Sequence, residues 1–273
     1  MANENNTPVR NSFLAIGSLA LIAMIIIPFP ALLMDILIAL LLISSLLIFL
    51  VSLCNRKPQI FSLLPTMFLV LAVFNLTIHI SITRLILTKG ADFDGLLVST
   101  FAALVTVPGD LGGIIVSLIF FVLFSSIMLI IVVKTNTRIS EIAASFTLDS
   151  LPGKQMALDA EYSSGCIEQR EYAIQKVTLQ KESDLYGALD GAGKFISGSF
   201  KFSVCLSLIN AIGGTIIGIS LFEKDLSSAV EIYIPLSIAA GFLVQISIAL
   251  QYAAIGIIVS RSRHKEGDNK FIF

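Results

Sequence analysis

Six long apolar runs limit what this chain can fold into more strongly than any other feature of its sequence. They cover residues 12–33, 36–53, 63–83, 112–133, 202–222 and 232–259. A helix needs roughly 20 apolar residues to cross a hydrocarbon core. An open sheet could not satisfy its backbone hydrogen bonds in lipid, and a barrel would show short alternating segments instead. The runs therefore predict an all-α integral membrane protein with about six transmembrane helices.

The first run could be mistaken for a secretory signal, because Arg10 precedes it. No small-residue cleavage site follows, and the next run begins directly after Asp35. Pro28 and Pro30 lack the amide hydrogen that a helix needs. We therefore expect the first span to be retained and to end in a tight hairpin at these prolines.

Composition excludes several classes of function. Only 14% of the residues are charged, whereas roughly a quarter are charged in soluble proteins. The net charge of −1 provides no basic field for nucleic acid. The cysteines and histidines are scattered, which predicts neither a disulfide framework nor a metal site. No pair of nucleophile and base can be named, so we expect neither an enzyme nor a bound cofactor.

Lysine and arginine are distributed unevenly between the two sides of the membrane. If the N-terminus is cytoplasmic, 15 of the 18 basic residues face the cytoplasm. Because cytoplasmic loops carry the excess of basic residues, both ends are predicted to be cytoplasmic. The chain then divides into a tail, four spans, a cytoplasmic loop, two spans and a second tail: residues 1–11, 12–133, 134–201, 202–259 and 260–273.

The cytoplasmic loop holds 17 of the 37 charged residues. Its first part, Arg138 to Phe146, is predicted to be a helix that continues out of the membrane and is broken at Pro152-Gly153. A second helix is expected from about Gly165 to Ala188, with Ser163 or Ser164 as its cap. Such a short helical pair cannot bury a core of its own. It must pack on the bundle, on a neighbouring subunit or on a partner.

Three ordered blocks of residues carry a family resemblance. The first is Arg138-x-x-Glu141-x-x-Ala144-x-Phe146-x-Leu148-Asp149-x-Leu151-Pro152-Gly153-Lys154-Gln155-Met156-Ala157-x-Asp159-Ala160. The others are Asp184-x-Tyr186-Gly187-Ala188-x-Asp190-Gly191-Ala192-x-Lys194-Phe195 and Thr83-Arg84-Leu85-Ile86-Leu87. Together they resemble the FHIPEP family, the export-gate membrane proteins of flagellar and virulence type III secretion.

The resemblance, which covers about residues 30–261, implies a gate-forming subunit of a type III export apparatus in the bacterial inner membrane. The implied partners are other membrane subunits of the apparatus, further copies in a homo-oligomeric ring, the lipid bilayer and, indirectly, exported proteins, but no nucleic acid. Family members continue with further spans and a large cytosolic domain, so the short tail after residue 259 favours a truncated chain. A degenerate paralogue and an ion-coupled transporter are the alternatives.

Eight charged residues are candidates for export or proton coupling: Arg84, Arg138, Asp149, Lys154, Asp159, Asp184, Asp190 and Lys194. For loop charges the ordinary explanation is a solvated face, and the motif matches favour a function. A charge cluster at the mouth of the gate is expected from five of them: Asp149, Lys154, Asp159, Asp190 and Lys194. Arg84 is expected either to snorkel to the interface or to form an ion pair within the complex.

Several membrane charges of the family are missing. The resemblance places Arg at Asn75, Asn at His79, Arg at Ser145, and Asp at Ser199 and Ala240. It also implies coupling of the proton gradient to export, and these losses count against a proton route through this subunit.

Polar side chains and glycines remain inside the predicted spans. The polar set is Asn75, His79, Asn210, Gln245 and Gln251. Interhelical hydrogen bonding is their ordinary explanation. His79 could also titrate near neutral pH and shuttle protons. Four glycines predict close helix approach: Gly213, Gly214, Gly218 and Gly241.

Overall fold

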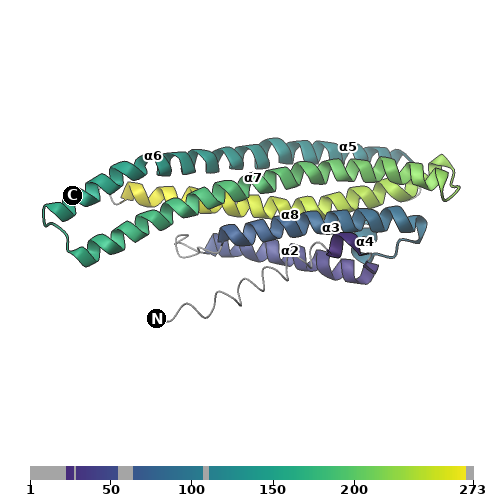
Figure 1. The fold of residues 1–273 in the computed structure, drawn as a ribbon. Coiled ribbons are helices and arrows are strands. Elements are labelled where there is room, and N and C mark those ends of the chain that lie inside the picture. The colour runs from purple at the N-terminus through teal and green to yellow at the C-terminus, as the bar shows by residue number, and fades with distance from the viewer. Residues whose placement is uncertain (1–22, 28, 55–63, 107–110, 269–273) are drawn as a thin grey trace. The chain divides into compact units, whose positions relative to one another are not determined.

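The computed structural model describes residues 23–27, 29–54, 64–106 and 111–268. All regular structure in these ranges is helical (Figure 1), which confirms the predicted all-α class. The helices are α2 (Ala31–Cys54), α3 (Leu64–Lys89), α4 (Leu96–Val105), α5 (Leu111–Ile127), α6 (Thr135–Ser163), α7 (Gln169–Ser220) and α8 (Leu226–Asp268). A 3₁₀ turn, Gly90–Asp92, follows α3, and a π-helical segment, Met128–Lys134, joins α5 to α6.

Five of the described helical stretches are long and apolar enough to cross a membrane. They contain α2, α3, α5 continued by α6, α7 and α8, and they overlap the second to sixth predicted spans. The first predicted span, residues 12–33, lies mostly outside the described residues. Its last three residues belong to α2.

The prediction that Pro152-Gly153 ends the first loop helix is wrong, because α6 continues through both residues to Ser163. Proline removes one backbone hydrogen bond, the one that the carbonyl of Leu148 would accept. Leu148, Pro152 and Gly153 all lie on an exposed face. Water can therefore donate a hydrogen bond to the Leu148 carbonyl, which has no amide donor because of the proline. The helix consequently tolerates Pro152.

The second loop helix and the fifth predicted span are one helix, α7, which corrects the expected end at Ala188. No proline occurs between Gln169 and Ser220, so every residue can donate its amide to the helix. The expected serine caps are also wrong, because Ser163 and Ser164 form the end of α6. Gly165 follows with φ +75°, the left-handed conformation that commonly ends a helix at glycine.

The helix α4 was not predicted. Its ten residues make it about 15 Å long, half the thickness of a hydrocarbon core. A search for apolar runs of about 20 residues therefore does not detect it. Its apolar side chains divide between the interior and the surface: Val98 and Ala102 are buried, whereas Leu96 and Leu104 are among the most exposed apolar residues of the chain.

The chain forms two compact units. One contains the described parts of residues 1–44, 71–126 and 199–247, and the other those of 45–70, 127–198 and 248–273. In the first unit, Phe242 of α8 packs edge-to-face on Phe121 of α5 with 5.1 Å between ring centroids, and Phe101 of α4 joins this core.

In the second unit, α6 and the first part of α7 form an antiparallel hairpin (Figure 1). Tyr162 near the end of α6 stacks on Tyr172 near the start of α7, with 4.7 Å between ring centroids. Two hydrogen bonds attach α8 to this hairpin. Tyr252 Oη donates to the Gly193 carbonyl at 2.9 Å, and Asn136 Nδ2 donates to the Tyr252 carbonyl at 3.0 Å.

Candidate functional site

Arg84 of α3 donates hydrogen bonds to the last carbonyls of the helical segment that precedes α2. Its Nη1 donates to the carbonyls of Ile25 at 3.1 Å and Ile26 at 2.6 Å, while Ser81 Oγ donates to the Met24 carbonyl at 2.8 Å. In a continuous helix these carbonyls would accept bonds from the amides four residues later, two of which belong to prolines and do not exist. Side chains of α3 therefore supply donors that the prolines cannot. The Arg84 contacts with described residues are to backbone oxygens.

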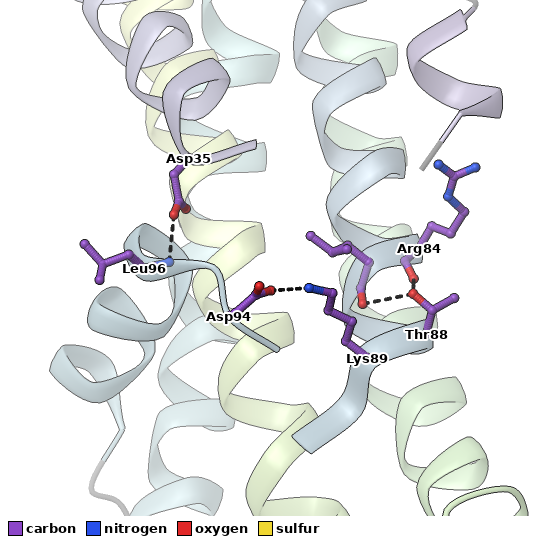
Figure 2. Close-up of polar contacts among 7 residues, drawn as sticks. Asp35, Arg84, Thr88, Lys89, Asp94 and Leu96 are labelled. Carbon is purple, nitrogen blue, oxygen red and sulfur yellow. Dashed lines mark hydrogen bonds and ion pairs between the residues drawn. The ribbon is translucent and has the colours of Figure 1, made fainter. Parts of the chain in front are cut away.

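Side chains from neighbouring helices hold both ends of α4. The amides of Leu96 and Leu97 donate to the Asp35 carboxylate at 2.7 and 3.1 Å, and Figure 2 shows Asp35 reaching from the start of α2 to Leu96. The residue before α4 is a glycine, which has no capping side chain, so Asp35 takes the role of the missing N-cap. At the other end, Ser117 Oγ of α5 donates to the Val105 carbonyl at 2.9 Å.

An ion pair closes the connection between α3 and α4. Lys89 Nζ lies 2.5 Å from Asp94 Oδ1, as Figure 2 shows. The hydrogen bond from Lys89 lowers the pKa of Asp94 below its ordinary value. The side chains are 35% and 61% exposed, so water screens the pair and its contribution to stability is small.

Charged residues of the matched sequence blocks meet in the hairpin at Lys194. Its Nζ lies 2.9 Å from Asp190 Oδ2 on the same helix and 3.6 Å from Glu141 Oε1 on α6. Lys194 therefore joins the two arms of the hairpin. Sequence analysis named Asp190 and Lys194 but did not single out Glu141, although it is part of the matched block.

The other loop candidates lie at separate places along the hairpin. Asp159 accepts a hydrogen bond from Tyr172 Oη at 2.7 Å. Asp149 accepts one from Ser145 at 3.2 Å, and Asp184 accepts one from Gln180 at 2.9 Å. Arg138 is exposed and Lys154 is half-buried. Of the expected five-residue cluster, Asp190 and Lys194 form an ion pair.

A line of buried polar side chains runs along α3 and α7 in the first unit. We call it the polar seam, and it consists of Asn75, His79, Thr83, Ser203, Ser207 and Asn210. Each member is at least nine-tenths buried, and Asn75, His79 and Asn210 are completely so. One side-chain contact crosses it, with 3.4 Å between Ser207 Oγ and His79 Nε2. The two predicted candidates, Asn75 and His79, thus share one interface with α7.

The glutamine candidates have partners of their own. Gln245 Oε1 accepts a hydrogen bond from Ser125 of α5 at 3.1 Å, which ties α8 to α5 in the first unit. Gln251 Nε2 donates to Ser45 Oγ at 3.4 Å in the second unit. Interhelical hydrogen bonding, the ordinary explanation given to these residues, matches both contacts.

Three of the four glycines expected at helix contacts do face a neighbour. A methyl group on Gly218 would lie 2.7 Å from the ring of Tyr233 on α8, and one on Gly214 would lie closer still to that ring. Gly241 faces Phe121 and Ser207 in the same way. Gly213 has open space around it.

Sequence reasoning missed two residues of this architecture. Asp35 is the sole charged residue between Arg10 and Arg56, and that isolation was a usable signal, since an acid inside an apolar run needs a partner. Tyr233 gave no such signal, because only the folded chain places it against two glycines of α7. Within the described ranges, no group of three or more His, Cys, Asp or Glu side chains is arranged to hold a metal ion.

Comparison with known proteins agrees with the matched blocks. The flagellar biosynthesis protein FlhA of Borreliella burgdorferi is 40% identical over 260 residues, which are 95% of this chain and 37% of the relative. FlhA of Bacillus subtilis is 34% identical over 93% of this chain and 36% of the relative. The low calcium response locus protein D of Yersinia pestis is 32% identical over 92% of this chain and 35% of the relative. No solved structure matches.

The chain thus spans just over a third of the length of these relatives. The sequence pattern of the FHIPEP family matches residues 21–272, which is nearly the whole chain. This membrane protein belongs to the FHIPEP family.

Proposed function

We propose that this chain forms the membrane-embedded part of a protein-export gate of the flagellar or type III kind, in the bacterial inner membrane. The observation that carries the proposal is the family match over residues 21–272, joined to relatives that are named for flagellar biosynthesis. A further relative is named a putative flagellar export and assembly protein and is 35% identical over 89% of this chain. Five helical stretches of membrane-spanning length among the described residues support an embedded role.

In this proposal both ends of the chain and the α6–α7 hairpin lie in the cytoplasm. The distribution of lysine and arginine supports this topology, because 15 of 18 basic residues then face inward. The loop that contains the hairpin holds 17 of the 37 charged residues. The hairpin also exposes large apolar side chains, among them Phe146 and Met156. Exposed apolar side chains beside charges suit contact with other proteins.

The hairpin is therefore our candidate surface for the other membrane subunits of the apparatus and for further copies of this chain in a ring. Lys194 is the residue with the strongest claim to a role there, because it joins α7 to Glu141 of α6 while remaining 55% exposed. An exposed ion pair contributes little to folding stability. A loss of Lys194 should consequently act on export more than on the amount of folded protein.

The proposal is tested with an in-frame deletion of the gene, complemented by the full-length gene or its variants, and with secreted filament subunit or effector as the readout. We expect the deletion to abolish secretion, the full gene to restore it, and Lys194→Ala to lower it several-fold. Lys181→Ala is the matched control, because Lys181 is an exposed lysine of the same helix. An immunoblot of the membrane fraction confirms equal protein levels.

Normal secretion by the deletion strain would contradict the export role and favour a degenerate paralogue. Normal secretion by the Lys194→Ala variant alone would not contradict the gate proposal. It would show that Lys194 is an ordinary solvated surface residue.

A further inference from the structure

The polar seam has a simple geometry, because α3 and α7 run in the same direction along it. Ser199 Oγ lies 3.5 Å from the Ala72 carbonyl, and Ser207 Oγ lies 3.4 Å from His79 Nε2. The sequence separations are 127 and 128, and a nearly constant separation is what two parallel helices in register produce. The same offset places Asn75 level with Ser203. An offset of 127 places Thr83 level with Asn210, so the seam extends about 12 Å from Asn75 to Thr83 at 1.5 Å per residue.

Most hydrogen-bonding atoms of the seam have no partner among the described residues. Both amide atoms of Asn75 and both of Asn210 lack one, as do His79 Nδ1, Thr83 Oγ1 and Ser203 Oγ. By the offset between the two helices, the residues that carry these atoms lie at the same three levels of α3 and α7. A buried polar atom without a partner is costly in any protein interior, and more so where the surroundings are lipid. Such a concentration at one interface therefore indicates a ligand that forms hydrogen bonds.

The size and charge of the seam limit what that ligand can be. The side chains of Asn75, His79 and Asn210 are completely buried within this chain, so neither a lipid headgroup nor a side chain of another subunit has room to reach them. None of the buried polar side chains in the described ranges is Asp, Glu, Lys or Arg, and an ion of either sign would therefore lack one of these counter-charges in a medium of low dielectric. A small neutral molecule that both donates and accepts hydrogen bonds meets these conditions.

We propose that the polar seam is a binding site for ordered water molecules, held between α3 and α7 by Asn75 and Ser203 at one end and by Thr83 and Asn210 at the other. Each water bridges donors and acceptors that direct contacts leave unpaired, as buried waters do in other proteins. His79 Nδ1 takes part at the middle level. The inference does not depend on the export role.

The test is brief X-ray radiolysis of the full-length protein in detergent or nanodiscs, followed by peptide mass spectrometry. Radiolysis produces radicals from water in place, so side chains beside bound water are oxidised even when they are buried. His79 is the probe. Phe121 is the control, because it is 2% exposed and reactive but lies in an aromatic core. We expect His79 to be oxidised at least several-fold faster than Phe121, and equal slow rates would overturn the proposal.

Two variants decide whether the oxidation reports this site. Asn75→Leu combined with Asn210→Leu should lower the oxidation rate of His79 several-fold while leaving Phe121 unchanged. Should the double variant fail to fold, Asn210→Ser alone provides the same comparison with a smaller expected decrease. An unchanged His79 rate in a folded variant would contradict a water site held by these amides. Exchange of potassium chloride for choline chloride should not change the oxidation rate of His79. A rate that depends on the salt would indicate that the ligand is a cation and not water.

Discussion

The contact between Gly214 and Tyr233 allows a prediction with an internal control, because Gly213 beside it faces open space. A methyl group on Gly214 would lie 2.7 Å from Cγ of Tyr233 and 3.0 Å from its Cβ. Carbon atoms in contact prefer about 3.5–4.0 Å. The Cβ atom is fixed to the backbone of α8, so a rotation of the ring cannot relieve the conflict. The two helices must move apart instead.

The expected magnitude follows from two opposing effects. Alanine in place of glycine inside a helix gains about 1 kcal/mol from helix propensity, and this gain applies equally to Gly213 and Gly214. Overpacking of a well-packed interior costs about 1–3 kcal/mol and applies only to Gly214. Gly213→Ala should therefore be neutral or stabilising. Gly214→Ala should have a free energy of unfolding lower than that of Gly213→Ala by about 1–3 kcal/mol.

The assay is reversible unfolding of the purified protein in mixed detergent micelles, followed by circular dichroism as the denaturing detergent is increased. A second substitution, Tyr233→Leu, removes the ring that Gly214→Ala would strike. In a double-mutant cycle the two changes should therefore couple favourably, by about 0.5–3 kcal/mol. Equal stability of Gly213→Ala and Gly214→Ala, with no coupling to Tyr233→Leu, would refute the close packing of α7 on α8.

Three further predictions concern the helix ends in Figure 2. Arg84→Met should destabilise the chain by about 1 kcal/mol for each hydrogen bond lost to a carbonyl, measured in the same unfolding assay. Asp35→Ala should cost about 0.5–2 kcal/mol and speed hydrogen exchange at the Leu96 amide, with Asp35→Asn intermediate. Because Lys89 lowers the pKa of Asp94, the stabilisation by this pair is present above the ordinary aspartate pKa of 3.8 and is lost as the pH falls through the lowered value. The stability difference between wild type and Lys89→Met should accordingly be present at neutral pH and vanish in acid.

The positions of the second to sixth spans were predictable because continuous apolar runs admit one explanation in a membrane. The glycine that follows α3 is a local signal for the end of that helix, and the sequence analysis did not use it. Gly90 adopts φ +55°, a conformation that favours glycine, and a methyl group there would strike the Tyr233 hydroxyl. The third predicted span, residues 63–83, follows the apolar run, and the helix that contains it continues through Arg84 to Lys89.

Other features could not be predicted from one sequence. Pro152 is a helix breaker by propensity, and whether it breaks a helix depends on whether solvent can reach the carbonyl of Leu148, which only the fold decides. The bonds from Asp35 to the start of α4 join residues 61 and 62 positions apart, and no local pattern encodes them. The register between α3 and α7 is equally non-local. The polar candidates were therefore found individually, and their arrangement as one seam was not.

One face of α7 explains how the first unit holds together. The residues Ser203, Ser207, Asn210, Gly214 and Gly218 follow one another at intervals of three or four, which places them on the same side of the helix. Helices in lipid gain little from the hydrophobic effect, so their association depends on close packing of small residues and on interhelical hydrogen bonds. This face uses both, with glycines against Tyr233 of α8 and polar side chains against α3. A substitution that fills the glycines should separate α7 from α8 but spare the water site. Loss of the Asn210 amide should do the reverse, so the two contacts can be tested separately in one helix.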